Sequence, residues 1–163
     1  MLFHRQQPGQ VGCLYHSLYA LLGDESVLAH AEDLSDVRFT VRLAELGLLA
    51  FPLWITPATG PAADAAFWEA QRQHFTGLNA SEQSHVPLLV SIMGTAPPWL
   101  HSAALTLPIS HAEDWVQISD SNFSEPFTIP WAAFLLSDYA RAHRVEMLGP
   151  LDLDAYPPDH RTP

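Results

Sequence analysis

The single cysteine of this chain stands where a nucleophile is easily activated. Cys13 follows Gly12 and opens a stretch, Cys13–Leu22, in which leucines recur along one helical face before Gly23. The dipole and the free N–H groups at a helix start stabilise a thiolate. On count alone, a free cysteine more often just packs in a core. The position at a helix start nevertheless favours a reactive thiol at Cys13.

A thiolate that attacks a carbonyl group needs donors for the oxyanion that forms. A backbone N–H near the nucleophile and a side-chain amide can serve. Gln7 lies six residues before Cys13, and the loop between them contains two glycines that allow it to fold back over the helix start. Gln6 and Gln10 are rivals for the same role, and a solvated loop position is the alternative for each of them.

The base must be a histidine from a distant segment, and the chain has nine. His101 opens a predicted strand, so it can lie at a sheet edge facing the helix start. His16 is one helical turn from Cys13 and is expected to pack or cap. The strand after His101 returns as a hairpin, and its return strand ends at residues 119–122. There Asp120 could accept from His101 and fix its tautomer, while Asn122 could do so with an amide.

Two tryptophans flank this predicted hairpin. Trp99 precedes His101, and Trp115 begins the return strand. Either ring could form a wall of the cleft, and Gly12 would border it beside the thiol. Core packing is the more common role for a tryptophan. Because of their positions beside the predicted site, Gly12, Trp99 and Trp115 are nevertheless candidate substrate-binding residues.

The elements that must position these residues are helices first and strands later. Helices are predicted over 13–22, 26–32, 35–46, 61–75 and 131–141, and strands over 49–55, 86–93, 101–109, 115–119 and 143–148. Pro52 counts against a central place for the first strand. This order predicts an α+β fold with N-terminal helices packed on a mostly antiparallel sheet. We expect one domain over 1–152 and a loose tail over 153–163.

Composition narrows the function classes. The chain has 163 residues, 48% of them hydrophobic, and a net charge of -11. An acidic chain repels phosphate backbones, so nucleic acid is a poor partner. No apolar stretch reaches the length of a membrane span, and no signal-peptide core begins the chain, so we expect a cytoplasmic protein or one delivered without a cleavable signal. With one cysteine, neither an internal disulfide nor a cysteine-based metal site can form, and no cofactor or metal is expected.

The opening residues 3–23 resemble those of Josephin domains. Both have a Phe-His pair and a glutamine before the cysteine, then Cys-x-x-His and a Leu-x-x-Leu-Leu run. They are also similar to peptidase C39-like proteins, in which a glutamine precedes the cysteine. Residues 115–121 resemble the Josephin strand that ends in Asn-Ser or Asp-Ser after a tryptophan. The resemblance implies a papain-like cysteine protease fold with Cys13 as nucleophile, Gln7 in the oxyanion hole, His101 as base and Asp120 as third member.

Three functions fit these expectations. The first is a cysteine peptidase or isopeptidase that acts on a peptide or protein, ubiquitin-like proteins included. The second is an acyl or peptidyl transferase or a deamidase with the same site, because one fold hosts all of these chemistries. The third is a protein-binding domain without turnover, for which Cys13 would be unreactive. Ser119 remains an alternative to Asp120 and Asn122 as the third member, and the oligomeric state stays open.

Overall fold

The structure, a computed structural model, describes residues 1, 2, 5, 12–32, 36–54, 61–78, 84–95, 98–110 and 112–151. Its helical segments are α1 (Cys13–Leu22), η1 (Glu25–His30), α2 (Asp36–Glu45), α3 (Pro61–Leu78), α4 (Trp131–Phe134) and η2 (Asp138–Arg141), where η marks a 3-10 helix. Its strands are β1 (Leu48–Trp54), β2 (His85–Thr95), β3 (Pro98–Pro108), β4 (Trp115–Ser119), β5 (Phe127–Pro130) and β6 (Arg144–Pro150).

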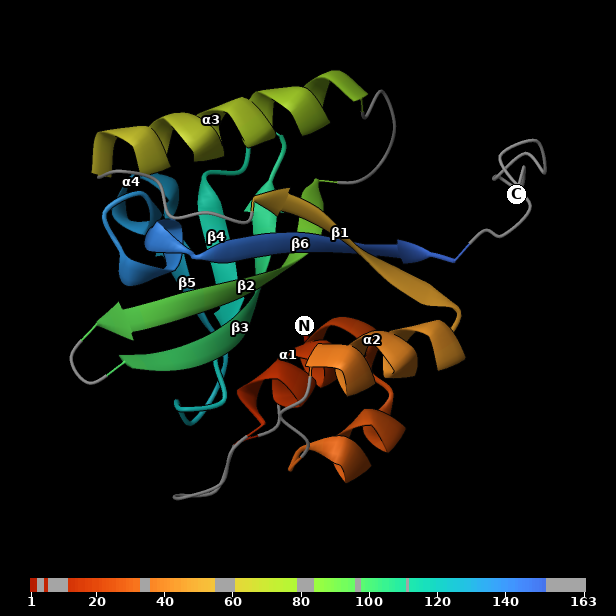
Figure 1. The fold of residues 1–163 in the computed structure, drawn as a ribbon. Helices are drawn as coiled ribbons and strands as arrows, with labels where there is room; N and C mark the ends of the chain where they lie inside the picture. The colour runs from red at the N-terminus through yellow and green to blue at the C-terminus, as the bar shows by residue number, and fades with distance from the viewer. Residues whose placement is uncertain are drawn as a thin grey trace, which may run out of the picture.

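The strands form one sheet in the order β1-β6-β2-β3-β4-β5. All neighbouring strands run antiparallel. α3 lies across one face, and α1 and α2 lie on the other (Figure 1). The expected combination of helices with an antiparallel sheet is therefore observed. The helices are less segregated than predicted, because β1 follows α2 and joins the sheet beside β6, and α3 follows β1.

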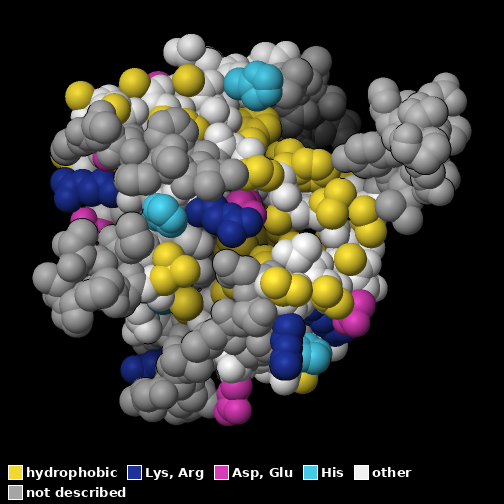
Figure 2. All heavy atoms as spheres, viewed as in Figure 1, with side chains coloured by type: hydrophobic (Ala, Val, Ile, Leu, Met, Phe, Trp, Pro, Cys, Tyr) yellow, Lys and Arg dark blue, Asp and Glu magenta, His cyan; other side chains and the backbone are white. Residues whose placement is uncertain are grey.

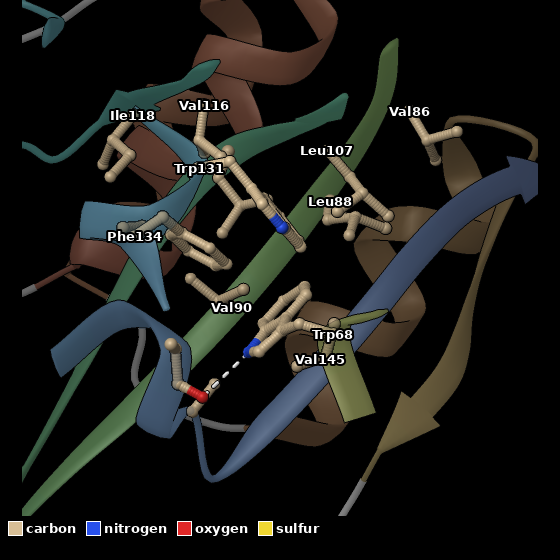
Figure 3. Packing of buried hydrophobic residues seen from close by; sticks show 14 of the residues in the cluster. Trp68, Val86, Leu88, Val90, Leu107, Val116, Ile118, Trp131, Phe134 and Val145 are labelled. Atoms are coloured by element: carbon tan, nitrogen blue, oxygen red, sulfur yellow. Dashed lines mark hydrogen bonds between the residues drawn. The ribbon is translucent and has the colours of Figure 1, made fainter. Parts of the chain in front are cut away.

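Each face of the sheet has its own hydrophobic core because side chains alternate along a strand. On the α3 face, the core includes Phe75 and Leu105. Trp68 and Val90 belong to the same core and are labelled in Figure 3. On the other face, Tyr15 and Leu18 of α1 and residues of α2 pack around Leu89. Leu89 and Val90 are consecutive, so β2 is buried on both sides. This explains the uninterrupted apolar run that predicted a core strand.

The helix predicted over 131–141 is interrupted. α4 ends at Phe134, and η2 begins only at Asp138. Ser137 stops the helix because both its backbone N–H and its hydroxyl donate to the Phe134 carbonyl oxygen, at 2.9 and 2.7 Å. The helix predicted over 26–32 is the 3-10 segment η1. β5 was not predicted, since four residues ending in Pro130 are too few to show an alternation.

The β1 edge of the sheet carries the proline that predicted an edge position. Pro52 pairs with Glu146 of β6, and the register shifts between Pro52 and Trp54. A proline and an irregular register both discourage further strand pairing. Apolar side chains gather over this edge, between α3 and α2 (Figure 2), and Phe51 is 39% exposed there. The predicted tail, from residue 152 on, lies outside the described residues.

Candidate active site

Cys13 is the first residue of α1, as the sequence predicted. Gly12 caps the helix with φ 113°, and its carbonyl oxygen accepts the N–H groups of Tyr15 and His16 at 2.9 and 3.2 Å. The cap must be glycine for two reasons. Only glycine adopts this φ readily, and a Cβ there would stand 1.8 Å from the carbonyl oxygen of Ala31. This contact fixes where the helix starts and hence where the thiol lies.

The thiol sits where β4 separates from β3. β3 residues 104–106 pair with β4, and the last pair at the site end is Ala104 with Ser119. Ser102 precedes Ala104 by two residues, beyond the end of this pairing. Backbone groups two residues apart point to the same side of a strand. Its N–H therefore points into the space that β4 has left, where it donates to Cys13 Sγ at 3.2 Å. A backbone donor at this distance favours the thiolate over the thiol.

His101 reaches the thiol from the opposite face of the sheet. It precedes Ala103 by two residues and so shares the face covered by α3. Its side chain is 11% exposed, and its Nε2 lies 2.7 Å from Asp120 Oδ1. The imidazole is also hydrogen-bonded to the Cys13 thiol. With Nε2 directed at the carboxylate, Nδ1 is the ring nitrogen that can exchange a proton with sulfur.

Asp120 is 3% exposed and both of its carboxylate oxygens accept hydrogen bonds. Besides His101 Nε2, Oδ1 accepts the backbone N–H of Asn122 at 2.9 Å. Oδ2 accepts the hydroxyl of Tyr139 at 2.6 Å. A buried carboxylate with this many donors is held in one orientation and in the charged form.

The two alternatives to Asp120 lie differently. The Asn122 amide nitrogen is 3.4 Å from each ring nitrogen of His101. An atom equidistant from both in the ring plane would collide with the carbon between them, so the amide lies over the face of the ring. Ser119 donates its hydroxyl to the carbonyl oxygen of Leu2 at 3.3 Å. Of the three residues, Asp120 makes the short contact with a ring nitrogen.

The charges in this group support one another. Burial alone would raise the pKa of the Cys13 thiol, but the hydrogen bond to His101, its positive charge and the Ser102 N–H outweigh burial and lower the pKa. Burial would lower the pKa of His101, but its hydrogen bonds to Asp120 and Cys13 and their negative charges raise it to about 9. A lowered thiol pKa beside a raised imidazole pKa favours a thiolate–imidazolium pair over the neutral thiol and imidazole.

Asp120 and Tyr139 complete the set. Burial would raise the pKa of Asp120, yet hydrogen bonds from His101, Tyr139 and the Asn122 N–H lower it. The pKa of Tyr139 is raised, first by burial and then by the adjacent Asp120 carboxylate. Asp120 is thus an anion and Tyr139 a neutral donor over the whole range in which the Cys13–His101 pair can be ionised.

The structure does not bring every candidate residue to this group. Trp115 lies at the opposite end of β4 from Asp120, and its ring is tilted on that of His85 with centroids 4.2 Å apart. It therefore lines no cleft beside Cys13, contrary to our expectation. Gly12 adjoins the thiol but is buried against Ala31, so its role is to shape the helix start.

The other candidates can be placed only in part. Trp99 lies in β3 and pairs with Gly94 of β2, but its side chain is outside the described residues. Gln7, predicted for the oxyanion hole, and its rivals Gln6 and Gln10 also fall outside the described residues. His16 is buried in α1.

Two contributors were not predicted from the sequence. The Ser102 N–H is a backbone group, so its role depends on strand pairing and leaves no residue-type signal. Tyr139 lies in the segment predicted as a continuous helix, where nothing marked its hydroxyl. The described part of the chain contains no cluster of three His, Cys, Asp or Glu side chains suited to a metal ion. The groups that the structure links in sequence are the Cys13 thiol, the His101 imidazole, the Asp120 carboxylate and the Tyr139 hydroxyl.

Comparison with known proteins adds no family assignment. No protein-family model matches the sequence, and no curated protein matches it either. Among the helices of the described ranges, none has the length and apolar character needed to cross a bilayer.

Proposed function

We propose that this protein is a papain-like cysteine hydrolase that cleaves a peptide or isopeptide bond. Cys13 is the nucleophile, His101 the general base and acid, and Asp120 the residue that orients His101. The observation that carries the proposal is the continuous set of contacts from the Cys13 thiol through His101 to the buried Asp120 carboxylate. Such a linked thiol, imidazole and carboxylate form an activated nucleophile.

The reaction follows from the protonation states. The Cys13 thiolate attacks the carbonyl carbon of the substrate, and the carbonyl π electrons move to oxygen. When the tetrahedral intermediate collapses, the C–N bond breaks and His101 gives its proton to the leaving amine. Neutral His101 then takes a proton from water as that water attacks the thioester. Collapse releases a carboxylic acid and restores the thiolate–imidazolium pair, so water is the only co-reactant in this scheme.

The oxyanion needs donors near Cys13. Its own N–H is at the first position of α1, where helix N–H groups have no partner within the helix. Gln7 remains our proposal for the side-chain donor, since a glutamine also precedes the cysteine in the families that the sequence resembles. A preorganised donor of this kind contributes about 10²- to 10³-fold to kcat.

The substrate class follows from the bond chemistry and the charge of the chain. A thiolate assisted by imidazolium suits a leaving amine, which needs a proton as it departs. The net charge of -11 disfavours polyanionic substrates and tolerates basic or neutral peptide segments. We therefore propose a peptide or protein substrate.

The test is the rate of iodoacetamide alkylation of Cys13 between pH 5 and 9. In the wild type, the lowered thiol pKa predicts a rate that stays high well below pH 8. In His101→Ala, the rate at pH 6 is expected to fall about 100-fold and to rise only near the free thiol pKa of about 8.5. His74→Ala, on exposed α3 surface, is the matched control and should follow the wild type.

Two outcomes are informative. Equal, slow alkylation rates in the wild type and in His101→Ala would contradict the proposal. They would favour a protein-binding domain with an unreactive Cys13. A reactive thiol that depends on His101 justifies a screen of fluorogenic peptide amides. Turnover that is lost in Cys13→Ala would then identify the hydrolase directly.

A further inference from the structure

Tyr139 makes a contact that the three-residue mechanism does not use. It lies in η2, and its hydroxyl donates to Asp120 Oδ2 at 2.6 Å, a distance typical of a hydrogen bond to an ionised acceptor. The hydroxyl of Tyr139 and the ring of His101 thus bind different oxygens of one carboxylate. Asp120 lies between them, nearly inaccessible to solvent.

The two oxygens of Asp120 have unequal support. Oδ1 accepts from both His101 Nε2 and the Asn122 N–H, whereas Oδ2 accepts from Tyr139 alone among the described residues. Water has little access to a carboxylate that is 3% exposed. Removal of the Tyr139 hydroxyl would therefore leave a buried anionic oxygen with poor compensation, which favours protonation or rotation of the carboxyl group.

The segment that carries Tyr139 is anchored to the core. The neighbouring residue Ala140 accepts a hydrogen bond from Trp68 Nε1 at 2.8 Å, drawn as the dashed line in Figure 3. Trp68 is fully buried in the core under α3. The ring of Tyr139 also contacts that of Phe127, with centroids 6.1 Å apart. A hydroxyl held on such a base can keep a partner in a fixed orientation.

We propose that Tyr139 is a positioning residue that holds the Asp120 carboxylate ionised and aimed at His101, and thereby maintains the reactive form of Cys13. The inference rests on the proposed function, because it needs a His101-dependent thiolate. Tyr139 transfers no proton and does not touch the reacting atoms. It acts through Asp120 alone, which separates it from a residue that merely packs.

The first test is the pH profile of Cys13 alkylation in Tyr139→Phe, which keeps the ring and removes the hydroxyl. Protonation of Asp120 at a higher pH would break its bond to His101, so the acid limb of the profile should move up by about one pH unit. At any one pH on that limb this corresponds to a rate about tenfold lower. His74→Ala, on the exposed surface of α3, is again the control and should superimpose on the wild type.

A double-mutant cycle separates positioning from general destabilisation. If Tyr139 acts through Asp120, Tyr139→Phe should cause no further loss of alkylation rate in an Asp120→Asn background. Losses that add in full, or a Tyr139→Phe profile identical to that of the wild type, would overturn the inference. Rates are compared at a temperature where urea unfolding shows every variant to be folded.

The same data separate the two proposals. If His101→Ala leaves the alkylation profile unchanged, the proposed function itself is wrong and the inference falls with it. If His101→Ala slows alkylation while Tyr139→Phe does not, the hydrolase proposal stands and Tyr139 has only a packing role.

Discussion

At the residue scale, the site depends on how one buried carboxylate distributes its hydrogen bonds. Asp120 directs Oδ1 to His101 and Oδ2 to Tyr139, so the imidazole receives a carboxylate that can neither turn away nor readily take up a proton. His101 is in turn hydrogen-bonded to the Cys13 thiol. Removal of the Asp120 carboxylate should impair activity strongly, because this carboxylate sets both the charge and the orientation of His101.

Asp120→Asn is expected to lower kcat/KM by about 10²- to 10⁴-fold, since an amide stabilises imidazolium less well and can favour the wrong tautomer. Fluorogenic turnover, or alkylation at pH 6, measures the effect. Asn122→Ala is the matched control. It keeps the backbone N–H that donates to Asp120 and removes only an amide over the ring face, so its effect should stay within about fivefold. A larger loss in Asn122→Ala than in Asp120→Asn would reverse the two assignments.

At the scale of elements, three segments meet at the point where the sheet opens. α1 brings Cys13 from one face, and β3 brings His101 from the other. β3 pairs with β4 from Ala104 to Thr106, and the stretch of β3 before Ala104 leaves room for the thiol beside the Ser102 N–H. The position of the α1 start therefore matters as much as the strand register, and Gly12 sets that position.

Gly12→Ala should destabilise the fold by about 3 kcal/mol or more, because a β-carbon cannot fit against the Ala31 carbonyl group and φ 113° is strained for alanine. Urea unfolding monitored by tryptophan fluorescence gives the change. Gly77→Ala in α3 is the control, since nothing lies within 4 Å of the point that its new methyl group would occupy. It should raise stability by up to about 1 kcal/mol. Equal effects at both glycines would contradict this account of the helix start.

At the scale of the whole molecule, the core under α3 supports a site that opens beside α1. Trp68 connects this core with the site. It packs in the core, and its Nε1 donates a hydrogen bond to the carbonyl oxygen of Ala140, the neighbour of Tyr139. α3 has no candidate catalytic residue of its own. Its contribution to the site is to fix η2 against the sheet.

Trp68→Phe is expected to reduce the free energy of unfolding by about 1–3 kcal/mol, since the buried Ala140 carbonyl group loses its donor. It should also slow Cys13 alkylation at pH 6, in the same direction as Tyr139→Phe. Ile109→Val, in the same core, costs about 0.5–1.5 kcal/mol and should leave alkylation unchanged. If both variants slow alkylation in proportion to their lost stability, the specific connection through η2 is wrong.

Local patterns predicted much of the framework. The start of α1 at Cys13 followed from a glycine before a leucine-rich helical stretch, and the pairing of β3 with β4 followed from alternation on both sides of a turn. The break between α4 and η2 was missed, because it depends on how Ser137 bonds to Phe134 rather than on helix propensity. Trp115 was misplaced because it lies in the same strand as the residue before Asp120 but at the far end.

The sequence by itself determined the types of chemistry available: one thiol at a helix start, histidines in distant segments and a carboxylate or amide after a return strand. The tertiary structure decided which of these groups meet. The Ala104–Ser119 pairing brings Asp120, rather than Asn122, to His101 Nε2, and the burial of Asp120 allows a tyrosine from η2 to bind its second oxygen. Contacts between segments far apart in the chain depend on register and packing, which no local pattern of residues encodes.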